Sequence, residues 1–140
     1  MSRNSWLFLA VVLCSCVSSE KRQEIVKLNQ YMVEGMTLYR NHCANCHQVN
    51  GEGLARVIPP LKDADYLKKM SGAELACAIQ KGMEGTIFVN EIMYNQKMPA
   101  VSSLTALEVA ELVTYVDNTW GSESGIYEVI VAQKELENCR

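Results

Sequence analysis

The chain contains 140 residues, which is the length of a single domain. Hydrophobic residues make up 49% and charged residues 21%, and the formal net charge is −3. These values exclude a disordered acidic tail and a basic nucleic-acid-binding protein, so we expect no nucleic-acid partner. Six cysteines and seven methionines accompany only two phenylalanines, which indicates that a group other than protein helps to fill the interior.

The N-terminus has the pattern of an export signal. Arg3 precedes the apolar residues 6–13, a run that is too short to span a bilayer but fits the core of a signal peptide. The next segment, LCSC, resembles the lipobox of bacterial lipoproteins, and by that resemblance Cys16 would be acylated and become the mature N-terminus. Ordinary secretion with cleavage near residues 18–19 is the alternative. Both interpretations predict a location outside the cytoplasm.

The chain is expected to divide into four segments. They are a lipoprotein-type signal peptide at 1–15, a lipidated N-terminus and tether at 16–28, a domain at 29–121, and a C-terminal extension with a short helix at 122–140. This division predicts a periplasmic protein anchored to the membrane through Cys16.

Helical spacing dominates beyond the tether, and no stretch alternates cleanly as a strand. Helices are expected at 30–43, 71–82 and 105–121, with a single turn at 65–69 and a weaker helix at 126–136. The second and third begin with capping-box patterns, at Ser71 and Thr105. The irregular stretches 48–64 and 83–103 are long for a compact domain, which indicates that they pack against a ligand.

Residues 43–47 read Cys-Ala-Asn-Cys-His, the C-x-x-C-H attachment signature of c-type haem. Two thiols three positions apart on a helical turn can reach the two vinyl groups of one porphyrin. The adjacent His47 then points its imidazole at the iron. A thioredoxin-like redox pair would need a preceding strand, and a zinc site would need a second ligand pair, which the isolated Cys77 and Cys139 do not supply. A Cys43–Cys46 disulfide would leave His47 without a role.

An electron carrier also needs a side chain on the other face of the iron. His42 is next to the attachment motif and cannot reach that face. Met98 is the preferred candidate, because it lies in the second long stretch and Pro99 favours an extended backbone there. Met93 is a second choice. The remaining downstream methionines, Met70 and Met83, fit packing roles beside helices.

Together these features resemble class I cytochrome c, in the form of a small bacterial mono-haem protein, over about residues 30–121. The resemblance implies an all-α cytochrome c fold of four or five helices around one covalently bound haem, so that 29–121 is the cytochrome c domain. The matching elements are Gly35 and Tyr39 with Leu112 and Tyr115, Gly51 and Gly53, Pro59, Met98 with Pro99, and Trp120 with Gly121.

The resemblance also implies the site. Haem c would be attached through Cys43 and Cys46, and the iron would be held by His47 and Met98. The carbonyl of Pro59 would accept the Nδ1 hydrogen of His47 and fix its tautomer. No catalytic residue is expected, because both axial positions would be taken.

The expected function is electron transfer between Fe(III) and Fe(II), as a carrier or as a subunit of an oxidoreductase complex. Its partners would be membrane proteins such as a quinol-oxidising complex, a terminal oxidase or a dehydrogenase. The alternative is a haem-based gas sensor or small haem enzyme in which Met98 is labile. Residues 83–103 contain no histidine or arginine, which makes a poor peroxidase pocket.

Two cysteines lie outside the family pattern. Cys77 falls on the apolar side of an expected helix and is interpreted as a small core residue. Oxidising surroundings would permit a disulfide between Cys77 and Cys139, but the sequence leaves that pairing open.

Overall fold

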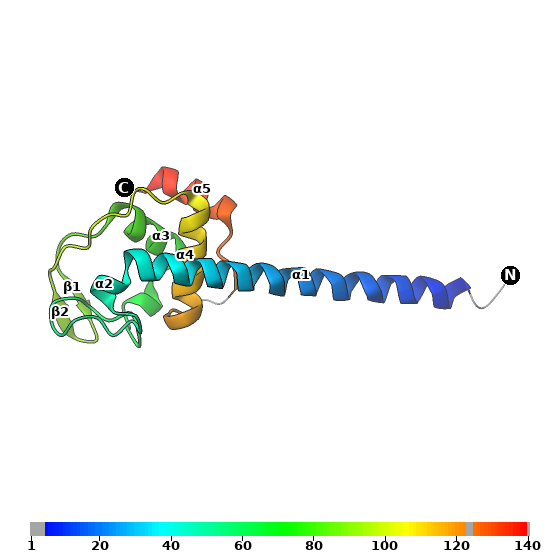
Figure 1. The fold of residues 1–140 in the computed structure, drawn as a ribbon, viewed down its shortest axis with the longest axis horizontal. Coiled ribbons are helices and arrows are strands. Elements are labelled where there is room, and N and C mark those ends of the chain that lie inside the picture. The colour runs from blue at the N-terminus through cyan, green and yellow to red at the C-terminus, as the bar shows by residue number, and fades with distance from the viewer. Residues whose placement is uncertain (1–4, 123–124, 140) are drawn as a thin grey trace. The chain divides into compact units, whose positions relative to one another are not determined.

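The computed structural model describes the backbone of residues 5–122 and 125–139, with side chains from residue 19 onward (Figure 1). The described chain is mostly helical, with a small two-stranded sheet. The elements in chain order are α1 (Ser5–His42), α2 (Ala44–His47), a 3₁₀ turn (Leu67–Lys69), α3 (Gly72–Lys81), β1 (Ile87–Val89), β2 (Ile92–Tyr94), α4 (Ala106–Trp120) and α5 (Val129–Asn138).

The chain divides into two units, residues 1–30 and residues 31–140. In the first unit, residues 5–30 are helical, so the segment 16–28 that was expected as a tether belongs to α1. The side chain of Cys16 lies outside the described part of the chain. Among the described residues, no helix combines the length and the apolar character needed to cross a membrane.

In the second unit, the C-terminal part of α1 crosses α4 at Gly35. A Cβ atom on Gly35 would lie 2.6 Å from the Cβ atom of Tyr115 and would overlap the backbone oxygen of Glu111. One turn later, Tyr39 is fully buried, and its ring lies 5.0 Å from that of Trp120 and 5.7 Å from that of Tyr115. Glycine at position 35 therefore permits the two helices to cross closely, and the rings of Tyr39, Tyr115 and Trp120 pack together next to the crossing.

Both predicted capping boxes are confirmed. At the start of α3, the hydroxyl of Ser71 accepts from the Glu74 amide, and the Glu74 carboxylate accepts from the Ser71 amide at 2.8 Å. Thr105 and Glu108 repeat this arrangement at the start of α4. These hydrogen bonds satisfy amides that would otherwise lack partners in the first helical turn.

The expectation of no strand was wrong, because β1 and β2 form an antiparallel hairpin within residues 83–103. Ile87 pairs with Tyr94 and Val89 with Ile92. Strands of three residues are too short for alternation to be visible in the sequence. The turn between them has Asn90 and Glu91 at positive φ, and it lacks the glycine that usually marks such turns.

The turn of this hairpin is held from outside. The Asn90 amide donates to the Asp65 carboxylate at 2.7 Å, and the Asn90 side chain accepts from the Asp65 amide at 3.0 Å. This contact joins segments 25 residues apart. It explains how a sequence with weak turn signals forms a hairpin.

The C-terminal extension forms α5, which packs against α3 and α4 (Figure 1). A disulfide joins Cys77 to Cys139, across 62 positions of sequence. Cys77, which was interpreted as a small core residue, is half-buried and disulfide-bonded, so the pairing that the sequence left open is present.

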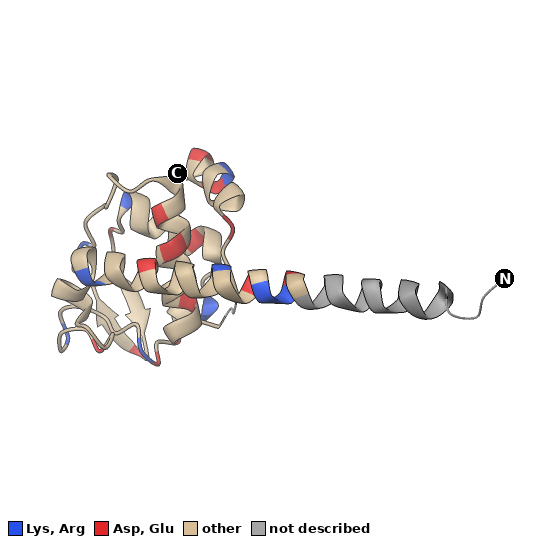
Figure 2. Cartoon of the chain, turned by 45° about the vertical axis from the view of Figure 1, so that its right-hand side comes forward, with Lys and Arg blue, Asp and Glu red and all other residues tan. Residues whose placement is uncertain are grey.

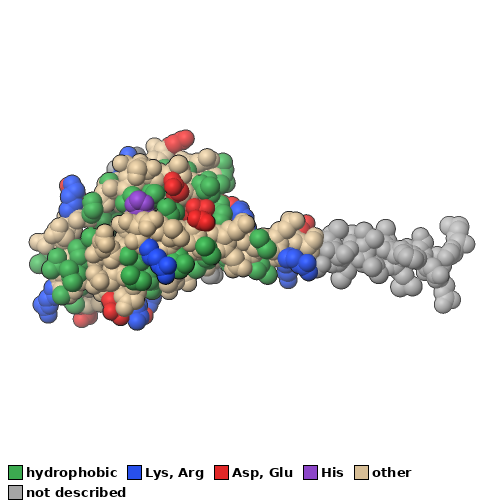
Figure 3. Space-filling view, viewed as in Figure 1, with side chains coloured by type: hydrophobic (Ala, Val, Ile, Leu, Met, Phe, Trp, Pro, Cys, Tyr) green, Lys and Arg blue, Asp and Glu red, His purple; other side chains and the backbone are tan. Residues whose placement is uncertain are grey.

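The surface of the second unit carries both signs of charge. Figure 2 shows the positions of acidic and basic residues spread over its helices and loops. Hydrophobic side chains lie between them on the face shown in Figure 3. Phe88 and Met93 form a cross-strand pair on the outer face of the hairpin and are 61% and 58% exposed.

Candidate haem site

The attachment motif occupies the junction of α1 and α2. The Cys43 amide donates to the Tyr39 carbonyl at 2.8 Å, and the His47 amide donates to the Cys43 carbonyl at 2.9 Å. The motif is therefore one continuous helical turn. This turn brings Cys43, Cys46 and His47 to the wall of a single cavity.

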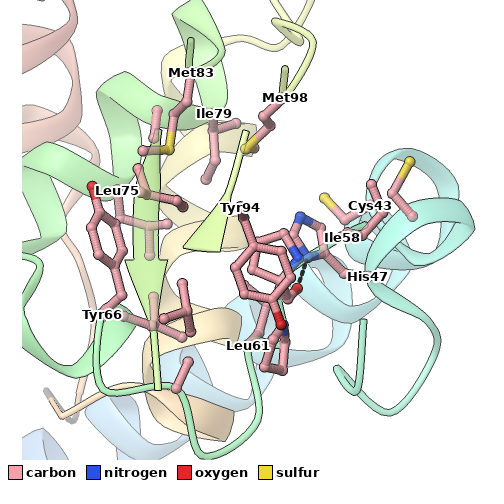
Figure 4. Close-up of a pocket in the computed structure, with 18 of the residues that line it drawn as sticks. Cys43, His47, Ile58, Leu61, Tyr66, Leu75, Ile79, Met83, Tyr94 and Met98 are labelled. Atoms are coloured by element: carbon pink, nitrogen blue, oxygen red, sulfur yellow. Dashed lines mark hydrogen bonds between the residues drawn. The ribbon is translucent and has the colours of Figure 1, made fainter. Parts of the chain in front are cut away.

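His47 is buried and is oriented by a backbone carbonyl. Its Nδ1 atom lies 3.1 Å from the Pro59 carbonyl oxygen, which is the dashed contact in Figure 4. Burial lowers the pKa of His47, and the hydrogen bond to Pro59 opposes that shift more weakly. The imidazole is thus neutral near neutral pH, with Nδ1 as the donor, which leaves Nε2 free to bind a metal.

Gly53 makes room for this carbonyl. Its φ angle is +69°, and a Cβ atom there would lie 2.7 Å from the Pro59 carbonyl oxygen. The Gly53 amide also donates to the His47 carbonyl at 2.9 Å. The second glycine after the motif therefore joins the histidine turn to the loop that orients the histidine.

Met98 reaches the same cavity from the second long stretch. Figure 4 shows Met98 and His47 projecting into the cavity from different segments. The backbone of Met98 pairs with that of Met83 through two N–H···O hydrogen bonds of 3.0 Å each. Met83 also lines the cavity, a position that sequence reasoning missed.

The rest of the wall is mainly apolar. It is contributed by the first long stretch, the 3₁₀ turn, α3, the hairpin and α4. These residues include Ile58, Leu61, Leu67, Leu75, Ile79, Val89, Tyr94, Leu112 and Val116. An apolar cavity with one imidazole and the thioethers of Met70, Met83 and Met98 suits a flat, apolar macrocycle whose own nitrogens supply most of the metal ligands.

The donor set does not suit a metal held by side chains alone. Among the described residues, no group of three or more histidine, cysteine, aspartate or glutamate side chains is placed to hold a metal ion. The disulfide between Cys77 and Cys139 removes the cysteines that a zinc site would need. The residues present therefore fit an iron ion brought by a porphyrin.

A thiol–disulfide redox role for the motif also conflicts with the structure. Burial raises the pKa of the Cys43 thiol to about 11. Reactive cysteines of C-x-x-C redox proteins instead have lowered pKa values, because the thiolate is the nucleophile. The segment before the motif is α1, whereas such proteins place a strand there.

Comparison with known proteins agrees with this geometry. Residues 22–120 match the family described as Cytochrome c. The chain belongs to the cytochrome c family. Haem c is therefore its covalent cofactor, with Cys43 and Cys46 as the attachment pair, and electron carriage is the function of the family.

Two kinds of curated relative illustrate the range of the family. The chain is 34% identical over 91 residues to cytochrome c-552 of Thermus thermophilus. That match covers 63% of this chain and 69% of that protein. It is 30% identical over 98 residues to the cytochrome c subunit of the quinone alcohol dehydrogenase of Gluconacetobacter polyoxogenes. That match covers 69% of this chain and 20% of the subunit.

Proposed function

We propose that this cytochrome c is an electron carrier without an enzymatic activity of its own, in which His47 and Met98 are the axial ligands of the haem iron. The observation that carries the proposal is the shared cavity of these two side chains and the attachment cysteines. Bound haem c supplies a one-electron couple between Fe(III) and Fe(II). With His47 and Met98 both holding the iron, no position on the iron would be left for a substrate.

The residues around the cavity would control that couple. Pro59 accepts a hydrogen bond from His47 and strengthens its donation to iron. A thioether ligand such as Met98 favours ferrous iron and raises the reduction potential. The apolar wall excludes water, so little solvent has to reorganise when the charge of the iron changes.

The surroundings of Met98 favour a carrier over a sensor or peroxidase. The neighbouring Lys97 forms an exposed ion pair with Glu84. Residues 83–103 contain no histidine or arginine that could assist cleavage of a peroxide. The tyrosine of this stretch, Tyr94, already uses its hydroxyl in a hydrogen bond, which it donates to the Ala55 carbonyl at 3.4 Å.

The test is carbon monoxide binding to the reduced, haem-loaded full-length protein, followed by its optical spectrum. A carrier with Met98 bound keeps an unchanged spectrum in carbon monoxide. Rapid formation of a carbon monoxide complex would contradict the proposal and favour the labile-methionine alternative. Absence of covalent haem would contradict both.

We further propose that the protein works outside the cytoplasm, in the periplasm, and is anchored to the membrane through lipidated Cys16. The attachment signature supports export, since c-type haem is attached outside the cytoplasm. A tether would raise the effective concentration of the carrier near membrane complexes. Replacing Cys16 with serine is expected to move the protein from the membrane to the soluble fraction, and a membrane-bound variant would refute the anchor.

Its proposed partners are a quinol-oxidising complex, a terminal oxidase or a dehydrogenase. The relative named as a subunit of a quinone alcohol dehydrogenase supports the last of these. Partner contact would be small and transient, as is usual for redox encounters. Reduction of the oxidised protein by membranes supplied with quinol would support this set, and reduction that is independent of quinol would exclude the quinol-oxidising complex.

A further inference from the structure

The C-terminal segment is attached to the domain at both of its ends. At its start, Gly125 exchanges two hydrogen bonds with the side chain of Asn118 in α4, at 2.7 and 2.9 Å. At its end, Cys139 is bonded to Cys77 in α3. Between them, Ala132 of α5 is fully buried. This segment lies beyond the part of the chain that matches the family.

The helix that receives the disulfide also holds the backbone around Met98. The Val101 amide donates to the Ile79 carbonyl of α3 at 2.9 Å, and Met83, just after α3, pairs with Met98. Gly82 ends α3 against this segment, since a Cβ atom on it would overlap the Met98 carbonyl oxygen and lie 2.8 Å from the Ala100 amide nitrogen. The position of Met98 is thus set by the C-terminal end of α3.

Cys77 is placed to stabilise α3 from the side away from the cavity. Leu75, Ala78 and Ile79 line the cavity, whereas Cys77 is not among the lining residues. The disulfide joins this outer side of α3 to α5, and α5 also packs on α4. A link across 62 positions restricts the chain much more than local contacts do.

We propose that the disulfide between Cys77 and Cys139 positions Met98, by fixing α3 against α5 and thereby holding the segment around Met98 in the haem cavity. The proposal rests on the proposed function, in which Met98 binds iron. Cys43 and Cys46 keep the haem attached to the opposite wall. Loss of the disulfide therefore loosens the Met98 side selectively and leaves the His47 side in place.

The direct test is amide hydrogen exchange on haem-loaded protein carrying Cys77→Ser and Cys139→Ser together. The amides of Met83, Met98 and Val101 bond the Met98 segment to α3 or to the residue just after it, and they are expected to exchange about tenfold faster than in the unaltered protein. That change corresponds to about 1.4 kcal/mol in the free energy of local opening. The Gly53 amide, bonded to the His47 carbonyl, is the internal control. Under native conditions, where amides exchange by local opening rather than by global unfolding, it is expected to keep its rate.

A second readout is the rate of carbon monoxide binding to the ferrous protein. The double variant is expected to bind carbon monoxide faster than the unaltered protein, whereas Thr37→Ala, at an exposed position of α1 away from the cavity lining, is not. If the double variant does not fold, dithiothreitol treatment of the ferrous protein breaks the same disulfide and gives the same comparison.

Unchanged exchange at the three amides would overturn the proposal. Equal acceleration at Gly53 would also overturn it, because the effect would then be general destabilisation. Rapid carbon monoxide binding by the unaltered protein would instead refute the role of Met98 as an iron ligand, which is a failure of the proposed function. The hydrogen-exchange rates test the disulfide separately, so the two failures can be told apart.

Discussion

Replacing Gly35 with alanine tests the helix crossing that supports the haem cavity. The new Cβ atom would lie 2.6 Å from the Tyr115 Cβ atom, whereas carbon atoms in contact prefer about 3.5–4.0 Å. The helices α1 and α4 must therefore separate by about 1 Å at the crossing. Because backbone at Glu111 is also in the way, the cost belongs at the upper end of the range for overpacking, about 3 kcal/mol.

The same substitution improves helix propensity by about 1 kcal/mol, so the net loss of stability is about 2 kcal/mol. Guanidinium unfolding of the oxidised, haem-loaded protein, followed by haem absorbance, measures this loss. Thr37→Ala is the control, because Thr37 is exposed on the same helix and its replacement is expected to stay within about 0.5 kcal/mol. A Gly35→Ala protein as stable as the unaltered one would refute the close crossing.

Three further predictions concern stability. Thr105→Ala removes the cap of α4 and is expected to lower the free energy of unfolding by about 1 kcal/mol in denaturant titrations. The cap lowers the pKa of Glu108. The stabilisation that the cap provides is therefore present above the usual glutamate pKa and is lost as the pH falls through the lowered pKa. A loss of stability in Thr105→Ala that does not depend on pH would contradict this. Glu111 has a raised pKa, because of burial first and then the charges of Glu34 and Glu108. The charged form of Glu111 therefore lowers the free energy of unfolding at pH values above that raised pKa. Glu111→Gln is expected to raise the thermal midpoint at pH 7 but not at pH 3, where the carboxyl group is protonated. Loss of the disulfide through Cys77→Ser and Cys139→Ser is expected to cost up to about 4 kcal/mol on the chain-entropy estimate, and a thermal midpoint unchanged from the unaltered protein would count against it.

The sequence was most informative where one local interaction decides the structure. Capping boxes at Ser71 and Thr105 involve residues three positions apart, so their pattern is visible directly. The C-x-x-C-H motif is equally local. Met98 was identified as a candidate because a methionine before a proline stands out in a long irregular stretch.

The features that sequence reasoning missed depend on contacts between distant segments. The hairpin depends on Asp65, which holds its turn from 25 positions away. The place of Met83 beside a helix predicts a packing role, but its backbone pairs with that of Met98 and it lines the cavity. The partner of Cys77 could not be chosen from spacing, because a disulfide needs only proximity in space.

The near-infrared spectrum of the oxidised protein decides whether Met98 binds the iron, when it is recorded for the unaltered protein, Met98→Ala and Met83→Leu. We expect a methionine-to-iron charge-transfer band in the unaltered protein and in Met83→Leu, and its loss in Met98→Ala. Both variants are expected to retain covalent haem through Cys43 and Cys46. A band that survives in Met98→Ala, or is absent from the unaltered protein, would contradict the assignment of Met98 as the axial ligand.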